Sequence, residues 1–174
     1  MVQINESEMI ARLRSGDITA LEYVYMEYAD RLYSFSLSIC KSKETAEDII
    51  ANVFLMVYNY LSSGKQIRNL KSFLYTSVRN ATYDEIKFSS RKEPLPEDDI
   101  YKSNTLDICE KVLITLLLDR LPSDEREIIL LYCYEGFLHK EIANILDIPE
   151  GTARWKYRNA IAKLKTWMGG VDND

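Results

Sequence analysis

The sequence predicts an all-α protein made of two small helical domains. Its 174 residues include only six glycines and four prolines, so residues that break helices are scarce. Apolar residues recur at steps of three and four along most of the chain, and no segment alternates apolar and polar residues for long. Hydrophobic residues make up 47% of the chain, which is enough for each half to bury a core of its own.

Four helices are predicted in the first part of the chain. Ser42 or Thr45 is a candidate N-cap for the third, where Thr45 and Asp48 have the spacing of a capping box. A polar, glycine-containing loop at 62–69 precedes the fourth. The predicted helices are Ser7–Leu13, Thr19–Cys40, one that ends near Leu61, and Leu70 to about Phe88. The inward face of the second is predicted to hold Leu21, Val24, Tyr25, Tyr28, Leu32, Phe35 and Ile39.

The middle of the chain is predicted to be an acidic, flexible linker. Pro94 and Pro96 favour extended backbone, and the run Glu97-Asp98-Asp99 cannot contribute to a core. Residues 94–125 carry a net charge of -5, whereas the chain on either side is neutral overall. The predicted divisions are residues 1–90 for the first domain, 91–107 for the linker, 108–168 for the second domain, and 169–174 for a disordered tail.

The second domain is predicted to contain a helix-turn-helix. A helix over Leu106–Leu118 precedes one from Asp124 to Tyr134, for which Ser123 is the expected N-cap. A short helix, His139–Leu146, is then followed by a turn at 147–151. Pro149 disfavours helix at the residue before it, and Gly151 is expected to permit a sharp turn. The last helix is predicted to start at Thr152.

The last helix is basic on a chain that is acidic overall. Residues 150–168 hold five basic side chains and one acidic one, whereas the whole chain has a net charge of -5. In a helix-turn-helix the second helix enters the DNA major groove, where such charges contact phosphates and bases. A helical hairpin with a solvated Lys/Arg face would give the same pattern, so the charges alone leave both interpretations open.

Other classes of protein find less support in the sequence. No glycine-rich phosphate loop, Ser/His/Asp set or pair of carboxylates in a plausible pocket indicates an enzyme, and we expect no cofactor. Cys40, Cys109 and Cys133 are expected to be buried thiols, since no spacing fits a metal site and His139 is the single histidine. No signal peptide or spanning run is evident, which predicts a cytoplasmic protein without membrane insertion.

Several stretches resemble the sigma factors of bacterial RNA polymerase, most closely the small extracytoplasmic-function group. LPSDEREIILLYCYEG and EIANILDIPEGTARWK are similar to the promoter-binding C-terminal domain of that family. LEYVYMEYADRLYSFSLSI, AEDIIANVFLMVY and LKSFLYTSVRNATYDEIK resemble its opening helix, its polymerase-docking segment and its promoter-melting helix. The resemblance implies an alternative sigma factor that directs core RNA polymerase to specific promoters. It also implies a probable anti-sigma partner and a monomer when free of polymerase.

The resemblance assigns candidate DNA contacts to both domains. Arg154 and Lys156 align with basic positions of the family, and Arg158 is expected to contact a phosphate. Thr152 is expected to cap the last helix, with its backbone amide meeting a phosphate. Trp155 either packs on a sugar or thymine methyl or covers the domain surface. In the first domain, the loop at 62–69 and the helix after it are expected to capture unstacked bases of the downstream promoter element. These downstream residues are Lys65, Gln66, Arg68, Asn69, Arg79, Asn80 and Tyr83.

The resemblance also places the polymerase contact on the third helix, at Asp48, Asn52 and Leu55. Ala51 and Asn52 replace the usual glutamine and glutamate of the family, which puts the strength of that contact in doubt. A sigma-like decoy that does not start transcription is therefore an alternative. A stand-alone helix-turn-helix regulator is a second alternative, although it would leave the first 88 residues without a role.

Overall fold

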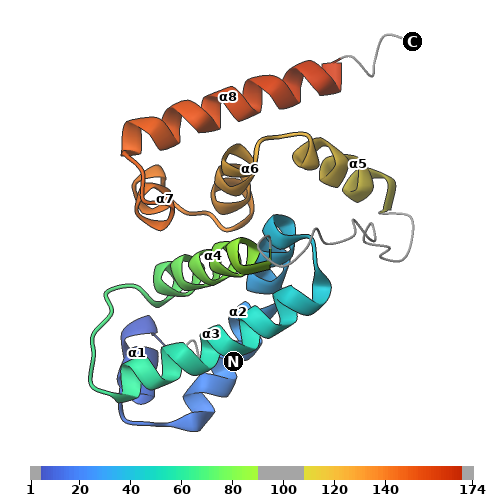
Figure 1. Ribbon diagram of the computed structural model, residues 1–174. Helices are drawn as coiled ribbons and strands as arrows, with labels where there is room; N and C mark the ends of the chain where they lie inside the picture. The colour runs from blue at the N-terminus through green and yellow to red at the C-terminus, as the bar shows by residue number, and fades with distance from the viewer. Residues whose placement is uncertain (1–4, 90–107, 170–174) are drawn as a thin grey trace. The chain divides into compact units, whose positions relative to one another are not determined.

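The computed structural model describes residues 5–89 and 108–169, and all regular structure in these ranges is helical. The chain divides into two compact units, residues 1–98 and 99–174. The all-α prediction with two helical domains is confirmed (Figure 1). The predicted linker at 91–107 and the tail after residue 169 lie outside the described residues.

The first unit is built from four helices whose ends follow the sequence signals closely. Asp17 caps the second helix by accepting a hydrogen bond from the Thr19 amide at 2.9 Å. Of the two candidates for the third cap, Ser42 fills the position and accepts from the Thr45 amide at 3.3 Å. The four helices are α1 (Glu6–Arg14), α2 (Ile18–Cys40), α3 (Lys43–Ser62) and α4 (Leu70–Ser89).

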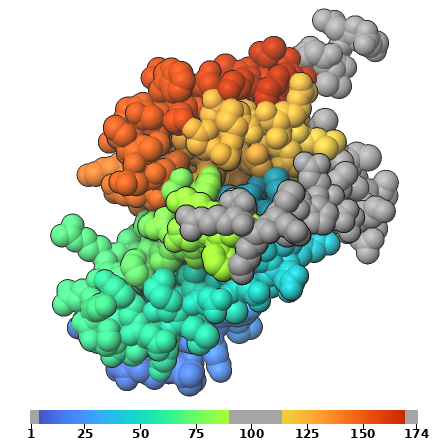
Figure 2. All heavy atoms as spheres, in the orientation of Figure 1, coloured from blue at the N-terminus to red at the C-terminus, as the bar shows by residue number. Residues whose placement is uncertain are grey.

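The core of the first unit forms where α2, α3 and α4 pack together. Phe35 of α2 meets the buried ring of Tyr75 on α4 edge-on, with 5.4 Å between ring centres. Figure 2 shows the atoms of α3 and α4 closely packed on the face in view. α3 contributes the largest buried stripe, which comprises Ala46, Ile49, Ile50, Val53, Phe54, Val57 and Leu61. Burying one of the larger side chains in this stripe, such as an isoleucine or the phenylalanine, contributes about 1.5–3 kcal/mol.

Two polar side chains inside this core satisfy each other. Ser36 and Thr82 are fully buried, with their hydroxyl oxygens 2.9 Å apart. Thr82 donates its own hydrogen to the Val78 carbonyl at 2.7 Å, so Ser36 must be the donor between the two hydroxyls. The pair links α2 to α4 without leaving a buried polar group unpaired.

The inward face predicted for α2 is confirmed at three positions and wrong at Tyr25, while Leu21, Tyr28 and Ile39 are only half-buried. Val24, Leu32 and Phe35 are buried as expected, but Tyr25 is 49% exposed. Its ring lies against Phe54 of α3, with 4.9 Å between ring centres, and so covers the edge of the core. The small residues Ala20 and Ala29 are buried in the interior of this helix instead, where they allow close helix approach.

The second unit consists of four α-helices and one π-helical turn in the described range. Pro122 occupies the N-cap position of α6 and gives it no side-chain cap, so the prediction that Ser123 is the cap was wrong. Ser123 is the first helical residue instead, because the Pro122 carbonyl already accepts the first hydrogen bond of the helix from the Arg126 amide at 3.0 Å. The elements are α5 (Ile108–Asp119), α6 (Ser123–Ile129), η1 (Leu130–Tyr134), α7 (His139–Leu146) and α8 (Glu150–Gly169).

Candidate nucleic-acid interface

Helices α7 and α8 form the predicted helix-turn-helix, but the turn is made by a different residue. Asp147 takes the left-handed conformation with φ 55°, and the Ile148 amide bonds back to the Ala143 carbonyl at 3.0 Å. Gly151 was expected to make this turn, yet it lies inside α8, which already begins at Glu150. An aspartate tolerates the left-handed region better than most side chains, which explains why Asp147 can make the turn in place of a glycine.

Thr152 is therefore not a helix cap. The Ala153 amide bonds to the Pro149 carbonyl at 3.1 Å, which places the start of the helix before Thr152. Thr152 lies half-buried in the first turn of α8. The cap prediction is corrected for this residue, while its contact with DNA stays a prediction. The free amides of a helix start are still available near it as phosphate donors.

Arg154, Trp155 and Arg158 project from α8 into solvent. Trp155 is 58% exposed, and both of its predicted roles stay predictions. The Arg154 guanidinium is held by Glu150, one turn earlier, with Nη2 and Nε at 2.5 and 3.1 Å from Oε1. An exposed i,i+4 pair of this kind contributes only a few tenths of a kcal/mol, so a DNA contact can replace it.

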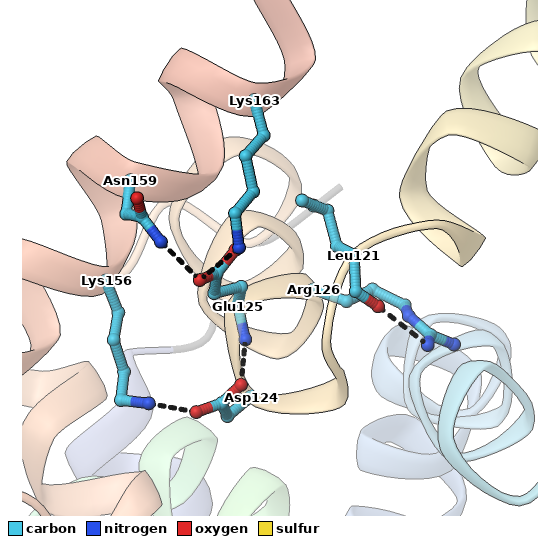
Figure 3. Close-up of polar contacts among 7 residues, drawn as sticks. All are labelled: Leu121, Asp124, Glu125, Arg126, Lys156, Asn159 and Lys163. Carbon is cyan, nitrogen blue, oxygen red and sulfur yellow. Dashed lines mark hydrogen bonds and ion pairs between the residues drawn. The ribbon is translucent and has the colours of Figure 1, made fainter. Parts of the chain in front are cut away.

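Lys156 differs from these residues because it is already engaged inside the unit. Its ammonium donates to Asp124 Oδ2 on α6 (Figure 3). Burial acts to raise the pKa of Asp124, but the hydrogen bond and the charge of Lys156 outweigh it and lower that pKa below its ordinary value.

The neighbouring Glu125 completes a buried polar network that the sequence interpretation missed. Glu125 is 5% exposed and accepts from Asn159 Nδ2 at 2.6 Å and from Lys163 Nζ at 2.8 Å (Figure 3). Lys156, Asn159 and Lys163 recur at steps of three and four, so they form one polar stripe of α8. That spacing, together with the adjacent acids Asp124 and Glu125, was the sequence signal that could have predicted the network.

A stacked aromatic group joins the π-helical turn to the helix-turn-helix. The rings of Tyr132 and His139 lie nearly parallel with centres 4.7 Å apart, and Tyr157 of α8 lies 4.5 Å from Tyr132. Burial, together with the Arg154 cation, lowers the pKa of His139, and burial raises the pKa of Tyr157. The Glu135 amide bonds to the Leu130 carbonyl five residues back, which defines the π turn.

The π turn also corrects the expectation that the cysteines are buried. Cys133 lies within it and is exposed, because the wider turn changes the face that each residue presents. Cys40 is only half-buried, and its thiol donates to the Ser42 carbonyl at 3.4 Å. The Cys109 side chain lies outside the described part. Residues 5–89 and 108–169 bring no three His, Cys, Asp or Glu side chains together at metal-binding distances.

The downstream candidates gather around the loop between α3 and α4. The Lys65 ammonium lies 4.7 Å from the centre of the Tyr60 ring, and Gln66 and Arg68 are exposed. Asn69 caps α4 through a 2.6 Å bond from the Ser72 amide. Figure 1 shows this loop at the outer edge of the first unit.

The remaining downstream candidates lie on α4 itself. The Arg79 guanidinium lies 4.8 Å from the centre of the Tyr83 ring, and Asn80 is exposed. The structure thus pairs Arg79 with Tyr83 on one side of the helix. Phe73 packs on Tyr60 of α3, with ring centres 5.1 Å apart.

The face of α3 opposite the core presents the polymerase candidates. Asp48, Asn52 and Leu55 are exposed, and Leu55 keeps 57% of its surface in contact with solvent. Beside them lies a shallow, mostly apolar hollow of about 480 Å³ between α2 and α3. It is lined by Leu21, Glu22, Tyr25, Met26, Ala51, Phe54 and Leu55.

The fold and the exposed basic helix define an all-α protein with a helix-turn-helix unit. The family described as Sigma-70 region 2 matches residues 24–92, and that described as Sigma-70, region 4 matches residues 111–164. The chain is 26% identical over 162 residues to the ECF RNA polymerase sigma factor SigM of Bacillus subtilis, with 88% of this chain and 98% of that protein covered. It is 22% identical over 167 residues to SigM of Mycobacterium tuberculosis, covering 95% and 85%.

Solved structures show the same fold. The chain matches the sigma factor RpoE of Bartonella quintana, solved in complex with the anti-sigma factor NepR, with a TM-score of 0.71. That match has 22% identity and covers 87% of this chain and 98% of the other. CnrH, solved in complex with the cytosolic domain of CnrY, also matches with a TM-score of 0.71, at 18% identity and covering 95% and 97%.

The chain belongs to the extracytoplasmic-function group of the sigma-70 family and is an alternative sigma factor that directs RNA polymerase to promoters. Proteins of this family are transcription initiation factors rather than catalytic enzymes. None of the helices in the described ranges is both long and apolar enough to cross a membrane.

Proposed function

We propose that the two units divide the work of promoter recognition. Residues 108–168 contact the upstream element through the first turns of α8, and residues 1–90 dock on core polymerase and open the downstream element. The observation that carries the proposal is the exposure of Arg154, Trp155 and Arg158 on the second helix of a helix-turn-helix. Lys156, held by Asp124, would either position α8 or leave that carboxylate and contact a phosphate with its ammonium group.

The downstream element requires a surface that can hold unstacked bases. The loop offers exposed Gln66 and Arg68 for hydrogen bonds to base edges, with Lys65 and Asn69 in the same loop. Asn80 is exposed further along α4. Stacking on an aromatic ring contributes about 1–3 kcal/mol per base, and Tyr83, paired with Arg79, is the ring on α4 that we propose for this contact. These contacts would act only once polymerase binding has brought the DNA to the loop.

Core polymerase would bind the exposed face of α3. Asp48 supplies a charge, Asn52 a polar group and Leu55 an apolar contact on this surface. The adjacent hollow offers apolar surface that a partner helix would bury, and this burial would offset the missing glutamine and glutamate. This supports a docking competent sigma factor over a decoy.

An anti-sigma protein is the second partner that we propose. RpoE of Bartonella quintana, which shares this fold, was solved in complex with an anti-sigma factor. CnrH, which also shares it, was solved in complex with the cytosolic domain of CnrY. We further propose that the protein is a cytoplasmic monomer when free of polymerase, with no catalysis of its own, no cofactor and no metal. Its activity would consist of binding and positioning alone.

Run-off transcription with purified core polymerase and genomic fragments tests these roles, with a pull-down on the same sample. Transcripts that depend on the protein are expected, together with capture of core polymerase. Capture without transcripts would favour the decoy. Tight binding to duplex DNA without capture would contradict the docking role of α3 and indicate a free-standing regulator.

A further inference from the structure

The start of α4 is capped by two side chains, one of which comes from a distant helix. The first amides of an α-helix have no partner inside the helix and need one from elsewhere. The Ser72 amide donates to Asn69 Oδ1 at 2.6 Å, and the Leu70 amide donates to Glu6 Oε1 at 2.5 Å. Glu6 lies in α1, 64 residues earlier, so this bond fixes α1 against the point where the loop ends.

Helix α1 is itself firmly anchored. Met9 and Leu13 are buried in the unit, and Leu13 is fully so. The turn after α1 is also held, since the Tyr58 hydroxyl of α3 donates to the Gly16 carbonyl at 2.9 Å. A carboxylate on such a helix has a defined position relative to α4, and its charge complements the positive end of the α4 dipole.

The opposite end of the loop is fixed by aromatic contacts. Tyr60 on the last turn of α3 packs on Phe73 of α4 and holds the Lys65 ammonium over its face. Between the two fixed ends the exposed side chains Gln66 and Arg68 face solvent. Both ends of the loop are therefore held before any DNA is present, which reduces the entropy cost of capturing a base.

We propose that Glu6 is a positioning residue for promoter melting, which holds the exit end of loop 63–69 by capping α4. This inference rests on the proposed base-capturing role of the loop. Glu6 touches no base in this scheme. It acts through the Leu70 amide and Asn69, which set the direction in which the loop enters α4.

The test compares Glu6→Ala with Glu6→Gln, using Glu8→Ala as the matched control. Glu8 is an exposed acid in the same first turn of α1. Each full-length variant is assembled with core polymerase on the strongest promoter fragment recovered by run-off transcription. Melting is followed by permanganate reactivity of unpaired thymines, and core binding by pull-down. Hydrogen exchange of the Leu70 amide in the free protein reports directly on the bond.

Glu6→Ala is expected to slow melting about fivefold, the factor that corresponds to the loss of one helix cap, with core binding unchanged. The Leu70 amide should exchange faster in the same variant. Glu6→Gln, whose amide oxygen still accepts the bond, should melt the promoter nearly as fast as the parent, and Glu8→Ala should match it. On a template with a preformed bubble the defect of Glu6→Ala should largely disappear.

Three outcomes would overturn the inference, and they point to different errors. Normal melting by Glu6→Ala, while Arg68→Ala is defective, would refute the role of Glu6 and leave the proposed role of the loop intact. Normal melting by Arg68→Ala and Gln66→Ala as well would refute the loop and the inference together. Equal loss of core capture and melting by Glu6→Ala would mean that the bond only supports the fold of the unit.

Discussion

Basic side chains of α8 fall into two groups according to what they contact. Arg154 and Arg158 are exposed, whereas Lys156 and Lys163 are engaged with carboxylates of α6. The first group is free to exchange its contacts for DNA at little cost, because exposed ion pairs contribute at most about 1 kcal/mol. The second group holds α8 against α6. A count of charges along the sequence cannot separate the two.

Arg154→Ala is expected to reduce upstream-element selectivity while core binding stays unchanged. Loss of a bidentate contact to a base costs about 1–3 kcal/mol, so transcription from the parent promoter should fall towards that from a promoter with the contacted base changed. Competitive run-off transcription on the two promoters measures the ratio. Lys165→Ala, an exposed basic residue near the other end of α8, is the control. An equal loss on both promoters would refute base reading by Arg154.

Lys163→Met is expected to destabilise the second unit by about 2 kcal/mol. Removal of the ammonium leaves the buried Glu125 carboxylate with Asn159 as its remaining partner in the network, and breaking a pair of this kind costs a few kcal/mol. Trp155 and Trp167, the chain's two tryptophans, both lie in α8, so urea unfolding followed by tryptophan fluorescence reports on this unit. Lys165→Met should stay within about 0.5 kcal/mol of the parent.

At the scale of elements, the π turn decides how α6 joins the helix-turn-helix. The extra residue in the turn brings Tyr132 onto His139 and Tyr157, and leaves Cys133 exposed. A continuous α-helix over the same residues would present a different face to α8. The aromatic stack therefore depends on a π turn, which helix propensities of the individual residues do not predict.

The stability of the second unit is expected to fall as the pH drops from 7.5 to 5.5. Burial and the nearby Arg154 cation lower the pKa of His139 in the fold, so the unfolded chain, with a pKa of about 6.5, binds its proton first. Asp124, whose pKa is lowered, stays ionised across this window. Urea unfolding at both pH values measures the effect.

The matched variant for this experiment is His139→Phe, which keeps an aromatic ring in the stack but has no proton to bind. Its stability should change less between the two pH values than that of the parent. An equal change in both proteins would assign the pH dependence to another group.

At the scale of the whole molecule, the charge distribution argues against tight binding to DNA by the free protein. The net charge is -5, although residues 150–168 are basic, and phosphate contacts supply most of the affinity for DNA. The free chain should bind duplex promoter DNA with a Kd of about 10⁻⁴–10⁻⁶ M, the range of non-specific binding at physiological salt. Fluorescence anisotropy measures this value. A Kd in the nanomolar range would contradict a polymerase-dependent role.

Much of the local structure could be predicted from the sequence. Helix periodicity and caps located α2 and α3 to within a residue or two, and α7 at its observed bounds, because these signals act between neighbouring residues. The resemblance to sigma factors likewise followed from short stretches in a fixed order. Failures occurred where two local signals competed, as at Ser123 and Pro122, or at Gly151 and Asp147.

By itself the sequence determined the fold class, the helix-turn-helix and the family, since each is encoded in the order and spacing of residues. Only the tertiary structure decided which charges are free and which are paired. Lys156 and Asp124 meet across 32 residues, and Glu6 reaches the start of α4 across 64. Contacts at such separations depend on how the helices pack, and packing is set by the whole core rather than by the residues that it brings together.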